Sequence, residues 1–196
     1  MADDGPIIML RGELVELGPL RPDLIDTYLR WMNDLDVIRT LSGSRMPVTR
    51  AMEQQWLDHM LTSSTDAVFT IYVKETSQPI GNCGLHNIST RHRTAEFGIG
   101  IGEKSAWNKG YGTEATRLML AYGFDVLGMQ NILLRVYANN PGAVRVYERA
   151  GFRKIGVRRN AMQLGRTRID EIYMDAIPDD IAPSDLQVLM EHGPSR

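Results

Sequence analysis

The stretch "WNKGYGTEA" (residues 107–115) places a lysine and two glycines directly before a strongly helical segment. A helix N-terminus presents unpaired backbone N–H groups and the positive end of the helix dipole. Glycines let a phosphate come close to those amides, and a lysine adds positive charge. The stretch therefore predicts an anion-binding loop, formed by Asn108, Lys109, Gly110, Tyr111, Gly112 and Thr113.

A solvated turn that happens to contain glycine is the alternative interpretation, because glycine pairs are common. The loop is not a P-loop, since no Gly-Lys-Ser or Gly-Lys-Thr follows it. It also lacks the third glycine and the following acidic strand end of a dinucleotide-binding fingerprint. The phosphate-bearing ligand must therefore be identified from other residues.

The preceding segment "EFGIGIG" has the alternation of a strand, with Glu96 and its glycines on one face and its apolar side chains on the other. A face without side chains favours either tight packing or a closely approaching ligand. Together with the loop, the second alternative predicts a long ligand with amides at one end and phosphates at the other. Coenzyme A fits, because its pantetheine arm can pair like an added strand. The expected contacts on this strand are Ile99, Gly100 and Ile101.

A second group of residues lies in "ANNPGAVRVYERAGF". Asn140 is a typical N-cap before a proline, and Gly151 is a typical left-handed residue at the helix end. Tyr147 lies two helical turns after Asn140, so both are expected on one face. For an asparagine and a tyrosine taken alone, the simpler interpretation is favoured, in which Asn140 only caps the helix and Tyr147 is a core residue.

Other chemistry is disfavoured. Cys83 as an acyl-carrying nucleophile would need a nearby base, and His86 three residues further along a strand points to the opposite face. The four histidines show no metal-ligand spacing, so no metal is expected.

The apolar pattern predicts the elements that position these residues. We expect helices at 22–33, 49–62, 113–127 and 141–150, and strands at 7–20 (one or a kinked pair), 67–75, 78–88, 93–102, 131–138, 151–157 and 168–177. This order predicts an α/β (α+β) fold, a single domain whose mixed, mostly antiparallel central sheet is flanked by helices. Residues 178–196 form either a loose tail or a docking segment.

Composition supports one compact soluble domain: 196 residues, 43% hydrophobic and 23% charged, with a net charge of -2. The balanced charge argues against nucleic-acid or membrane partners. No apolar run approaches the ~20 residues of a membrane span, and "MADDGP" does not have the layout of a signal peptide. The single cysteine indicates a reducing compartment, so a cytoplasmic location is expected.

Residues 66–177 resemble the GNAT superfamily of acetyl-CoA-dependent N-acetyltransferases. The resemblance rests on "WNKGYGTEA", similar to the pyrophosphate loop, and on "NNPGAVRVYERAGF", similar to the second signature. Within the superfamily, "HRTAEFGIGI" and "AYGFDVLGMQNILLRVYANN" are most similar to the ribosomal-protein N-terminal and spermidine acetyltransferases. The resemblance implies an N-acetyltransferase domain at 7–177, with its cofactor core at 66–177. We expect a flexible N-terminus at 1–6 and a tail at 178–196.

The resemblance implies acetyl-CoA as co-substrate and no metal, with Asn140 among the cofactor contacts. One position departs from the superfamily: Trp107 stands where an Arg or Gln is usual. The phosphates would then depend more on backbone amides and Lys109.

Acetyl transfer to an amine needs a neutral amine, a stabilised oxyanion and a protonated leaving thiolate. An alkylamine has a pKa near ~10.4 and an α-amine near ~8, so a base or water chain must remove a proton. The resemblance implies Tyr147 as the acid towards sulfur, and backbone N–H groups of residues 99–101 can serve the oxyanion. Glu96 is the favoured base unless it is a surface carboxylate paired with Arg91 or Arg93, and Asp170 is the alternative base or substrate contact.

The acceptor stays open between a protein N-terminus, a polyamine and a small amine. Asp34, Asp36 and Glu53 lie where the family builds its acceptor lip, although solvated surface charge explains any one of them. Glu114, in the first turn of its helix, is expected to be structural. The resemblance also allows a homodimer. Rival functions are a coenzyme A-binding sensor without turnover and a nucleotide-binding module.

Overall fold

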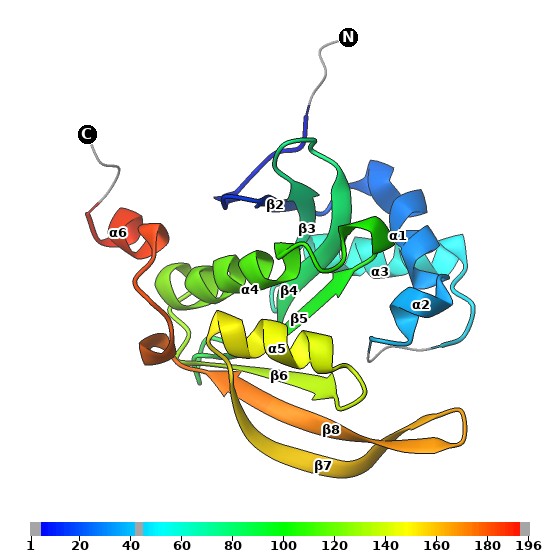
Figure 1. Cartoon of the computed structure of the whole chain (residues 1–196). Coiled ribbons are helices and arrows are strands. Elements are labelled where there is room, and N and C mark those ends of the chain that lie inside the picture. Colours follow the sequence, from blue (N-terminus) through cyan, green and yellow to red (C-terminus); the bar gives the residue numbers. More distant parts are fainter. Residues whose placement is uncertain (1–4, 42–44, 193–196) are drawn as a thin grey trace. The chain divides into compact units, whose positions relative to one another are not determined.

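The computed structural model describes residues 5–41 and 45–192, so the predicted terminal segments 1–6 and 178–196 are described only in part. The chain folds as two compact units. The first comprises residues 1–84 and 99–115, and the second residues 85–98 and 116–196. Two strands and one helix run through both units: β4 (Pro79–Ser89), β5 (Thr94–Ile101) and α4 (Tyr111–Ala121) (Figure 1).

The first unit holds the N-terminal strands, in the order β1-β2-β3-β4-β5. Its other elements are β1 (Leu10–Arg11), β2 (Val15–Pro19), β3 (Ala67–Val73), η1 (Pro22–Leu24), α1 (Ile25–Met32), α2 (Leu35–Ile38), α3 (Arg50–Thr62) and η2 (Lys104–Ala106). β2 pairs antiparallel with both β1 and β3. The predicted strand 7–20 is therefore a pair of strands joined by a turn.

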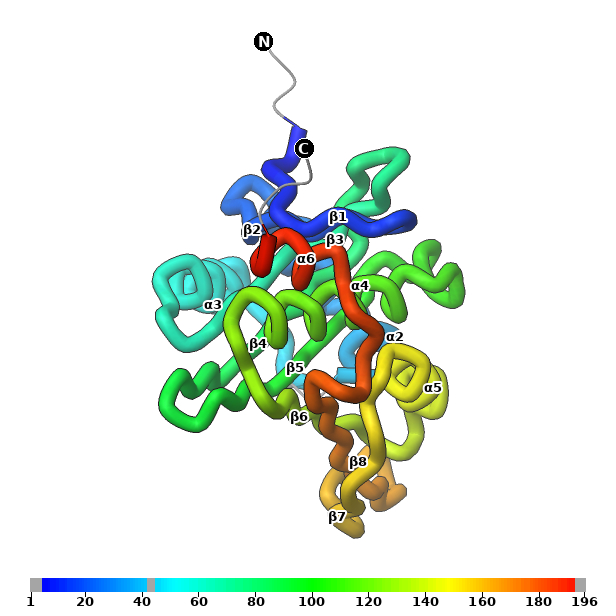
Figure 2. The backbone as a smooth tube through the Cα atoms, turned by 90° about the vertical axis from the view of Figure 1, so that its left-hand side faces the viewer, coloured from blue at the N-terminus to red at the C-terminus, as the bar shows by residue number. Residues whose placement is uncertain are grey.

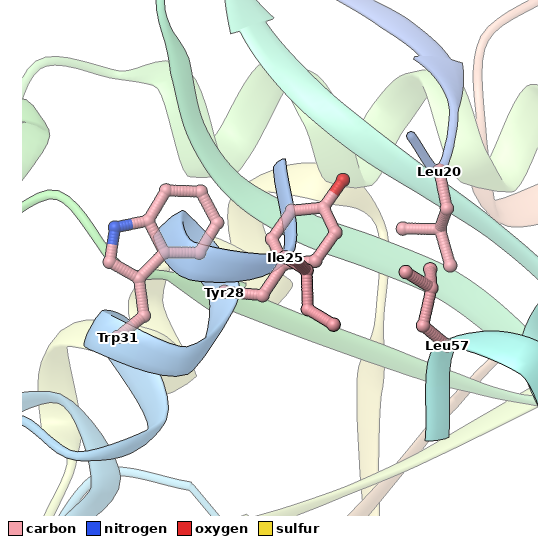
Figure 3. Close-up of a cluster of buried hydrophobic side chains, with 5 residues drawn as sticks. All are labelled: Leu20, Ile25, Tyr28, Trp31 and Leu57. Atoms are coloured by element: carbon pink, nitrogen blue, oxygen red, sulfur yellow. The ribbon is translucent and has the colours of Figure 1, made fainter. Parts of the chain in front are cut away.

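Leu20, which follows β2, and apolar residues of α1 and α3 form a buried cluster in the first unit. Figure 3 shows this cluster, which consists of Leu20, Ile25, Tyr28, Trp31 and Leu57. Tyr28 is at its centre, with its hydroxyl 2.6 Å from the Oγ1 of Thr70 on β3. A buried tyrosine usually finds such a partner, which here links α1 to the sheet.

The second unit continues the sheet in the order β4-β5-β6-β8-β7. It contains β6 (Asn131–Tyr137), β7 (Arg153–Leu164), β8 (Thr167–Ala176), α5 (Pro141–Ala150), the π-helix η3 (Tyr122–Val126), η4 (Pro178–Asp180) and α6 (Asp185–His192). β5 and β6 are parallel, whereas β6–β8 and β8–β7 are antiparallel. The predicted fold class, a mixed and mostly antiparallel sheet with helices, is confirmed.

Two helix predictions need correction. The helix expected at 113–127 begins at Tyr111, and its last turn is the π-helix η3, in which the N–H of Leu127 donates to the carbonyl of Tyr122. Beside this turn, a Cβ at Gly123 would lie 2.5 Å from Ile132 Cδ1, so the helix lies very close to β6 there. The short helix α2 was not predicted, since four residues are too few for a periodic pattern.

The C-terminal segment belongs to the second unit, and its helix α6, labelled in Figure 2, contacts η3. Ser184 Oγ donates to Asp125 Oδ2 at 2.5 Å, which holds the start of α6 against η3. Arg153 on β7 forms an ion pair with Asp180. In the described part of the predicted segment 178–196, these contacts hold residues 178–192 against η3 and β7. Within residues 5–41 and 45–192, no helix is both long enough and apolar enough to cross a membrane.

Candidate active site

The loop before α4 presents a row of backbone N–H groups. Asn108 and Gly110 have φ of 61° and 86°, so the chain alternates through left-handed conformations there. Among the described residues, the N–H groups of 108–111 donate to no protein acceptor. Successive free N–H groups at a helix start form an anion-binding nest. The geometry of the predicted phosphate loop is thus present in the first unit.

Trp107 fixes this loop to the end of β5. Its indole Nε1 donates to the carbonyl oxygen of Ile101 at 2.9 Å. The N–H groups of Gly102 and Glu103 both donate to Ile80, so the chain bends sharply where the strand ends. The tryptophan that stands where the resemblance predicts Arg or Gln therefore has a structural role.

β5 pairs with β6 over only a short stretch. The parallel register runs from Thr94↔Asn131 to Glu96↔Leu133, although β5 continues to Ile101 and β6 to Tyr137. Beyond Glu96, this edge of β5 has no strand partner among the described residues. Its N–H and C=O groups are therefore available to an added, strand-like ligand.

The glycine face of β5 is not empty. A Cβ at Gly98 would lie 3.5 Å from the His86 ring, and one at Gly100 would lie 3.3 Å from Leu41 Cδ2. Side chains of the protein thus pack on the face that was expected to receive the ligand. The distance at Gly98 is an ordinary van der Waals contact, so packing alone does not require these two glycines, and both residues are half-buried.

Tyr147 lies on α5 in a buried aromatic cluster of the second unit. Its ring makes edge contacts with Phe97 and Phe152 at centroid distances of 6.2 and 6.0 Å. Burial raises the pKa of Tyr147 to about 12. Within the described residues, its hydroxyl makes no hydrogen bond. A protonated phenol without a partner is suited to donate a proton to an incoming group.

The ends of α5 follow the predicted pattern. Asn140 Oδ1 accepts from the N–H of Ala143 at 3.1 Å, which confirms the N-cap. Gly151 ends the helix with φ of 121°, and the following Phe152 is buried. The capping role leaves the Nδ2 donor of Asn140 as the group that could contact a cofactor.

Glu96 forms an ion pair with a residue that the sequence analysis missed. Its Oε2 lies 3.2 Å from the Arg135 guanidinium, two residues beyond the point where β5 and β6 stop pairing. Neither Arg91 nor Arg93 fills this role, and Arg93 instead donates to the carbonyl of Gly128. The alternation in "NILLRVY" was a usable signal, because it places Arg135 on the same face as Leu133, opposite Glu96.

Asp170, the alternative base, holds an irregularity in the β7–β8 hairpin. Its Oδ1 accepts from the N–H of Asn160 at 2.8 Å, where the register shifts between Arg158 and Met162. Asn160 has a positive φ of 54°, so the carboxylate stabilises a strained bulge. This role makes Asp170 less available as a base.

The three acidic candidates of the N-terminal helices differ in their partners. Asp34 caps α2 and lies 2.7 Å from Lys104 Nζ, and the hydrogen bond from Lys104 lowers the pKa of Asp34. Asp36 contacts the same ammonium group at 3.2 Å. Glu53 is only 5% exposed and, among the described residues, its carboxylate has no hydrogen bond or ion pair. Burial therefore raises the pKa of Glu53.

Cys83 is buried, and burial raises the pKa of its thiol, so the reactive thiolate is disfavoured. Among the described residues, no group of three or more histidine, cysteine, aspartate or glutamate side chains could hold a metal ion. Among the described residues, the first unit thus offers a loop with unbonded N–H groups, and the second unit offers a buried phenol at Tyr147 and the carboxylate of Glu96.

The comparison with protein families identifies the class of protein. The model of the acetyltransferase (GNAT) domain matches residues 15–153. The chain therefore belongs to the GNAT acetyltransferase family.

Curated relatives carry related names. An uncharacterized N-acetyltransferase, p20 of Bacillus licheniformis, is 32% identical over 54% of this chain and 58% of its own length. The probable N-acetyltransferase YjcK of Bacillus subtilis is 30% identical over 72% of this chain and 75% of its own. The chain spans little more than half the length of p20 and of YoaA, another B. subtilis relative.

Solved structures share the fold. The spermidine N-acetyltransferase of Vibrio cholerae, in complex with CoA and spermine, has a TM-score of 0.79 at 21% identity. That similarity covers 86% of this chain and 98% of the other. A GNAT-family acetyltransferase from Bacillus anthracis gives a TM-score of 0.74 at 20% identity, over 87% and 98% of the two chains.

Proposed function

We propose that this protein transfers the acetyl group of acetyl-CoA directly to a primary amine in a ternary complex. The carrying observation is the row of unbonded N–H groups at residues 108–111, in a chain of the GNAT acetyltransferase family. These amides and Lys109 would hold the diphosphate. The unpaired edge of β5 would receive the pantetheine arm as an added strand.

Tyr147 would protonate the leaving sulfur in this reaction. The amine nitrogen forms a bond to the acetyl carbon, the C–S bond breaks, and the thiolate takes the phenolic proton. A thiolate in a desolvated site becomes more basic than its usual value of ~8.5, which favours this transfer. The oxyanion of the tetrahedral intermediate would be stabilised by backbone N–H groups at residues 99–101.

Glu96 is the proposed base, acting on the amine directly or through water. We expect Glu96→Gln to lower kcat/KM by about tenfold or more, because general-base catalysis contributes this much or more. The loss should be greatest at low pH, where the amine is most protonated. The measurement is a pH–rate profile of the variant beside the unmodified protein.

Arg135→Gln is the matched control, because it breaks the same ion pair and leaves the carboxylate in place. It should keep the pH profile of the unmodified protein. If Glu96→Gln and Arg135→Gln lose activity equally, the activity depends on the ion pair and not on Glu96 as a base. If the loss in Glu96→Gln does not depend on pH, the base is Asp170 or a water chain.

Glu53 is the proposed contact of a cationic acceptor, since it alone of the three acidic candidates lacks a partner among the described residues. Its raised pKa means that burial favours the protonated form. The stability that the neutral Glu53 carboxyl contributes is fully present below the pKa of this group in the unfolded chain, near 4.5. It is lost as the pH rises through the raised pKa of the folded protein. At neutral pH the ionised Glu53 should therefore lower the stability of the folded protein when no acceptor is bound.

Glu53→Gln should have opposite effects on stability and on substrate binding. We expect its Tm at pH 7 to rise by about 2–4 °C, equivalent to ~1 kcal/mol, and this gain to vanish near pH 4. The KM for a polyamine should rise by about tenfold, equivalent to ~1.4 kcal/mol. Asp58→Asn, an exposed carboxylate on the same helix, is the control for both. An unchanged KM would rule Glu53 out as a substrate contact.

The proposed function is tested by release of free CoA from acetyl-CoA in the presence of three acceptor classes: an N-terminal peptide, a polyamine and a small alkylamine. Turnover with one class would support the proposal and identify the acceptor. Tight binding of acetyl-CoA without turnover on any of them would indicate a sensor instead. Thermal stabilisation by ATP or NAD but not by acetyl-CoA would indicate a nucleotide-binding module.

A further inference from the structure

Glu114 makes an unusual set of contacts for a residue in the first turn of a helix. Its carboxylate accepts from three consecutive backbone N–H groups, those of Glu13 at 2.9 Å, Leu14 at 2.8 Å and Val15 at 2.7 Å. These donors belong to the β1–β2 turn, defined here as residues 12–15. The turn lies about a hundred residues away in sequence but in the same compact unit.

Gly12 and Gly110 show how closely the two segments approach. A Cβ at Gly12 would lie 2.6 Å from Glu114 Oε2, so no larger residue fits there while this contact is present. A Cβ at Gly110 would lie 3.5 Å from Leu14 Cδ1. The β1–β2 turn therefore contacts both the first turn of α4 and the phosphate loop itself.

The electrostatic consequence concerns the phosphate loop. A carboxylate in the first turn of a helix is attracted to the free N–H groups there and would repel a bound diphosphate. In this protein the charge of Glu114 is instead compensated by the N–H groups of the β1–β2 turn. The N–H groups of residues 108–111 remain without a protein acceptor among the described residues.

We infer that Glu114 is a positioning residue for diphosphate binding, which acts by clamping the β1–β2 turn onto the loop that precedes α4. The inference rests on the proposed function, because it assumes that the loop binds the diphosphate of CoA. It extends the cofactor-binding machinery to residues 12–15. It also assigns a specific role to Glu114, for which the sequence predicted only a structural one.

The test compares CoA, which carries the diphosphate, with the acetyl donor S-acetylpantetheine, which lacks it. Glu114→Ala should raise the Kd for CoA by about tenfold or more, because three charge-assisted hydrogen bonds that fix the loop are lost. The KM for S-acetylpantetheine, which has no diphosphate, should change by no more than about twofold. Calorimetry gives the first quantity, and steady-state kinetics of thioester cleavage gives the second.

Two further variants keep the test valid if Glu114→Ala folds poorly. Gly12→Ala disturbs the same contact from the other side and should reproduce the selective loss, since its added methyl group would meet Glu114 Oε2. Glu16→Gln removes a carboxylate of the same hairpin, one that pairs with Arg11. It should change neither the Kd for CoA nor the KM for S-acetylpantetheine. Thermal unfolding of all three variants monitors global stability.

Selective loss of CoA affinity in both Glu114→Ala and Gly12→Ala would support the inference. If the Kd for CoA and the KM for S-acetylpantetheine rise by the same factor and the Tm falls, the contact is merely structural and the inference is overturned. An unchanged Kd for CoA would also overturn it. If the unmodified protein does not bind CoA at all, the proposed function itself fails, so the two failures are distinguishable.

Discussion

Replacement of Tyr147 by phenylalanine is expected to lower kcat by about 10²–10³-fold, while the Kd for acetyl-CoA changes by no more than about twofold. The variant removes only a hydroxyl that forms no hydrogen bond within the described residues. The ring contacts with Phe97 and Phe152 are retained, so the fold should be unaffected. Single-turnover kinetics beside equilibrium binding would separate the chemical step from affinity.

The pKa of Tyr147 sets the pH behaviour in this experiment. Because burial raises it to about 12, the phenol stays protonated well into the alkaline range. The rate of the unmodified protein should therefore not fall between about pH 8 and 10 from loss of this acid. The stability that the neutral phenol contributes is full below its unfolded pKa of 10.0 and is lost as pH rises towards 12.

The Tyr147 prediction has a clear contrary result. If Tyr147→Phe turns over at the rate of the unmodified protein, the sulfur receives its proton from another donor, such as water. A parallel fall in kcat and in acetyl-CoA affinity would instead point to a packing role in the aromatic cluster. Tyr173→Phe, a substitution of another tyrosine in the second unit, controls for a general effect of losing a phenol.

Substitution of Gly110 by alanine should impair binding of acetyl-CoA. Gly110 has φ of 86°, a conformation that costs a residue with a Cβ roughly 1–2 kcal/mol. The loop can relieve this strain only by rotating the amides that are proposed to hold the diphosphate. We expect the Kd to rise by about 10- to 100-fold, measured by calorimetry with CoA.

Gly165→Ala is the matched control for this substitution. Gly165 also has a positive φ, of 58°, and lies in open space in the turn between β7 and β8. Both variants introduce comparable backbone strain, but only Gly110→Ala changes the phosphate loop. If both variants weaken CoA binding equally, or if neither does, the loop is not the diphosphate site.

The features predicted correctly from the sequence are those specified over short distances. The α5 helix has its predicted bounds, because its cap, its proline and its terminal glycine all act within one turn of its ends. The strand segments follow from alternation of apolar residues, which depends on neighbouring positions alone. The glycines of the loop before α4 were likewise recognisable from adjacent residue types, and Gly110 has the positive φ that favours glycine.

The features that the sequence left open lie where distant segments meet. Pairing of Glu96 with Arg91 or Arg93 was the alternative to its role as the base, and the register of β5 and β6 places it beside Arg135 instead. The sequence favoured a ligand over tight packing at the glycines of β5, and only the structure shows that the side chains of His86 and Leu41 lie beside them. Composition does not reveal which side chain fills a space, because this depends on how the chain folds back on itself.

By itself, the sequence determined the GNAT family, the mixed sheet with its helices, and the residues from which a phosphate loop and a capped helix are built. Only the tertiary structure decided that the edge of β5 beyond Glu96 has no strand partner among the described residues, that Trp107 donates to Ile101, and that Glu114 accepts from residues 13–15. The physical reason is the separation in sequence over which each kind of interaction acts. Caps, turns and alternation act between residues a few positions apart, whereas ion pairs, strand edges and clamping contacts depend on pairings between segments that only the folded chain brings together.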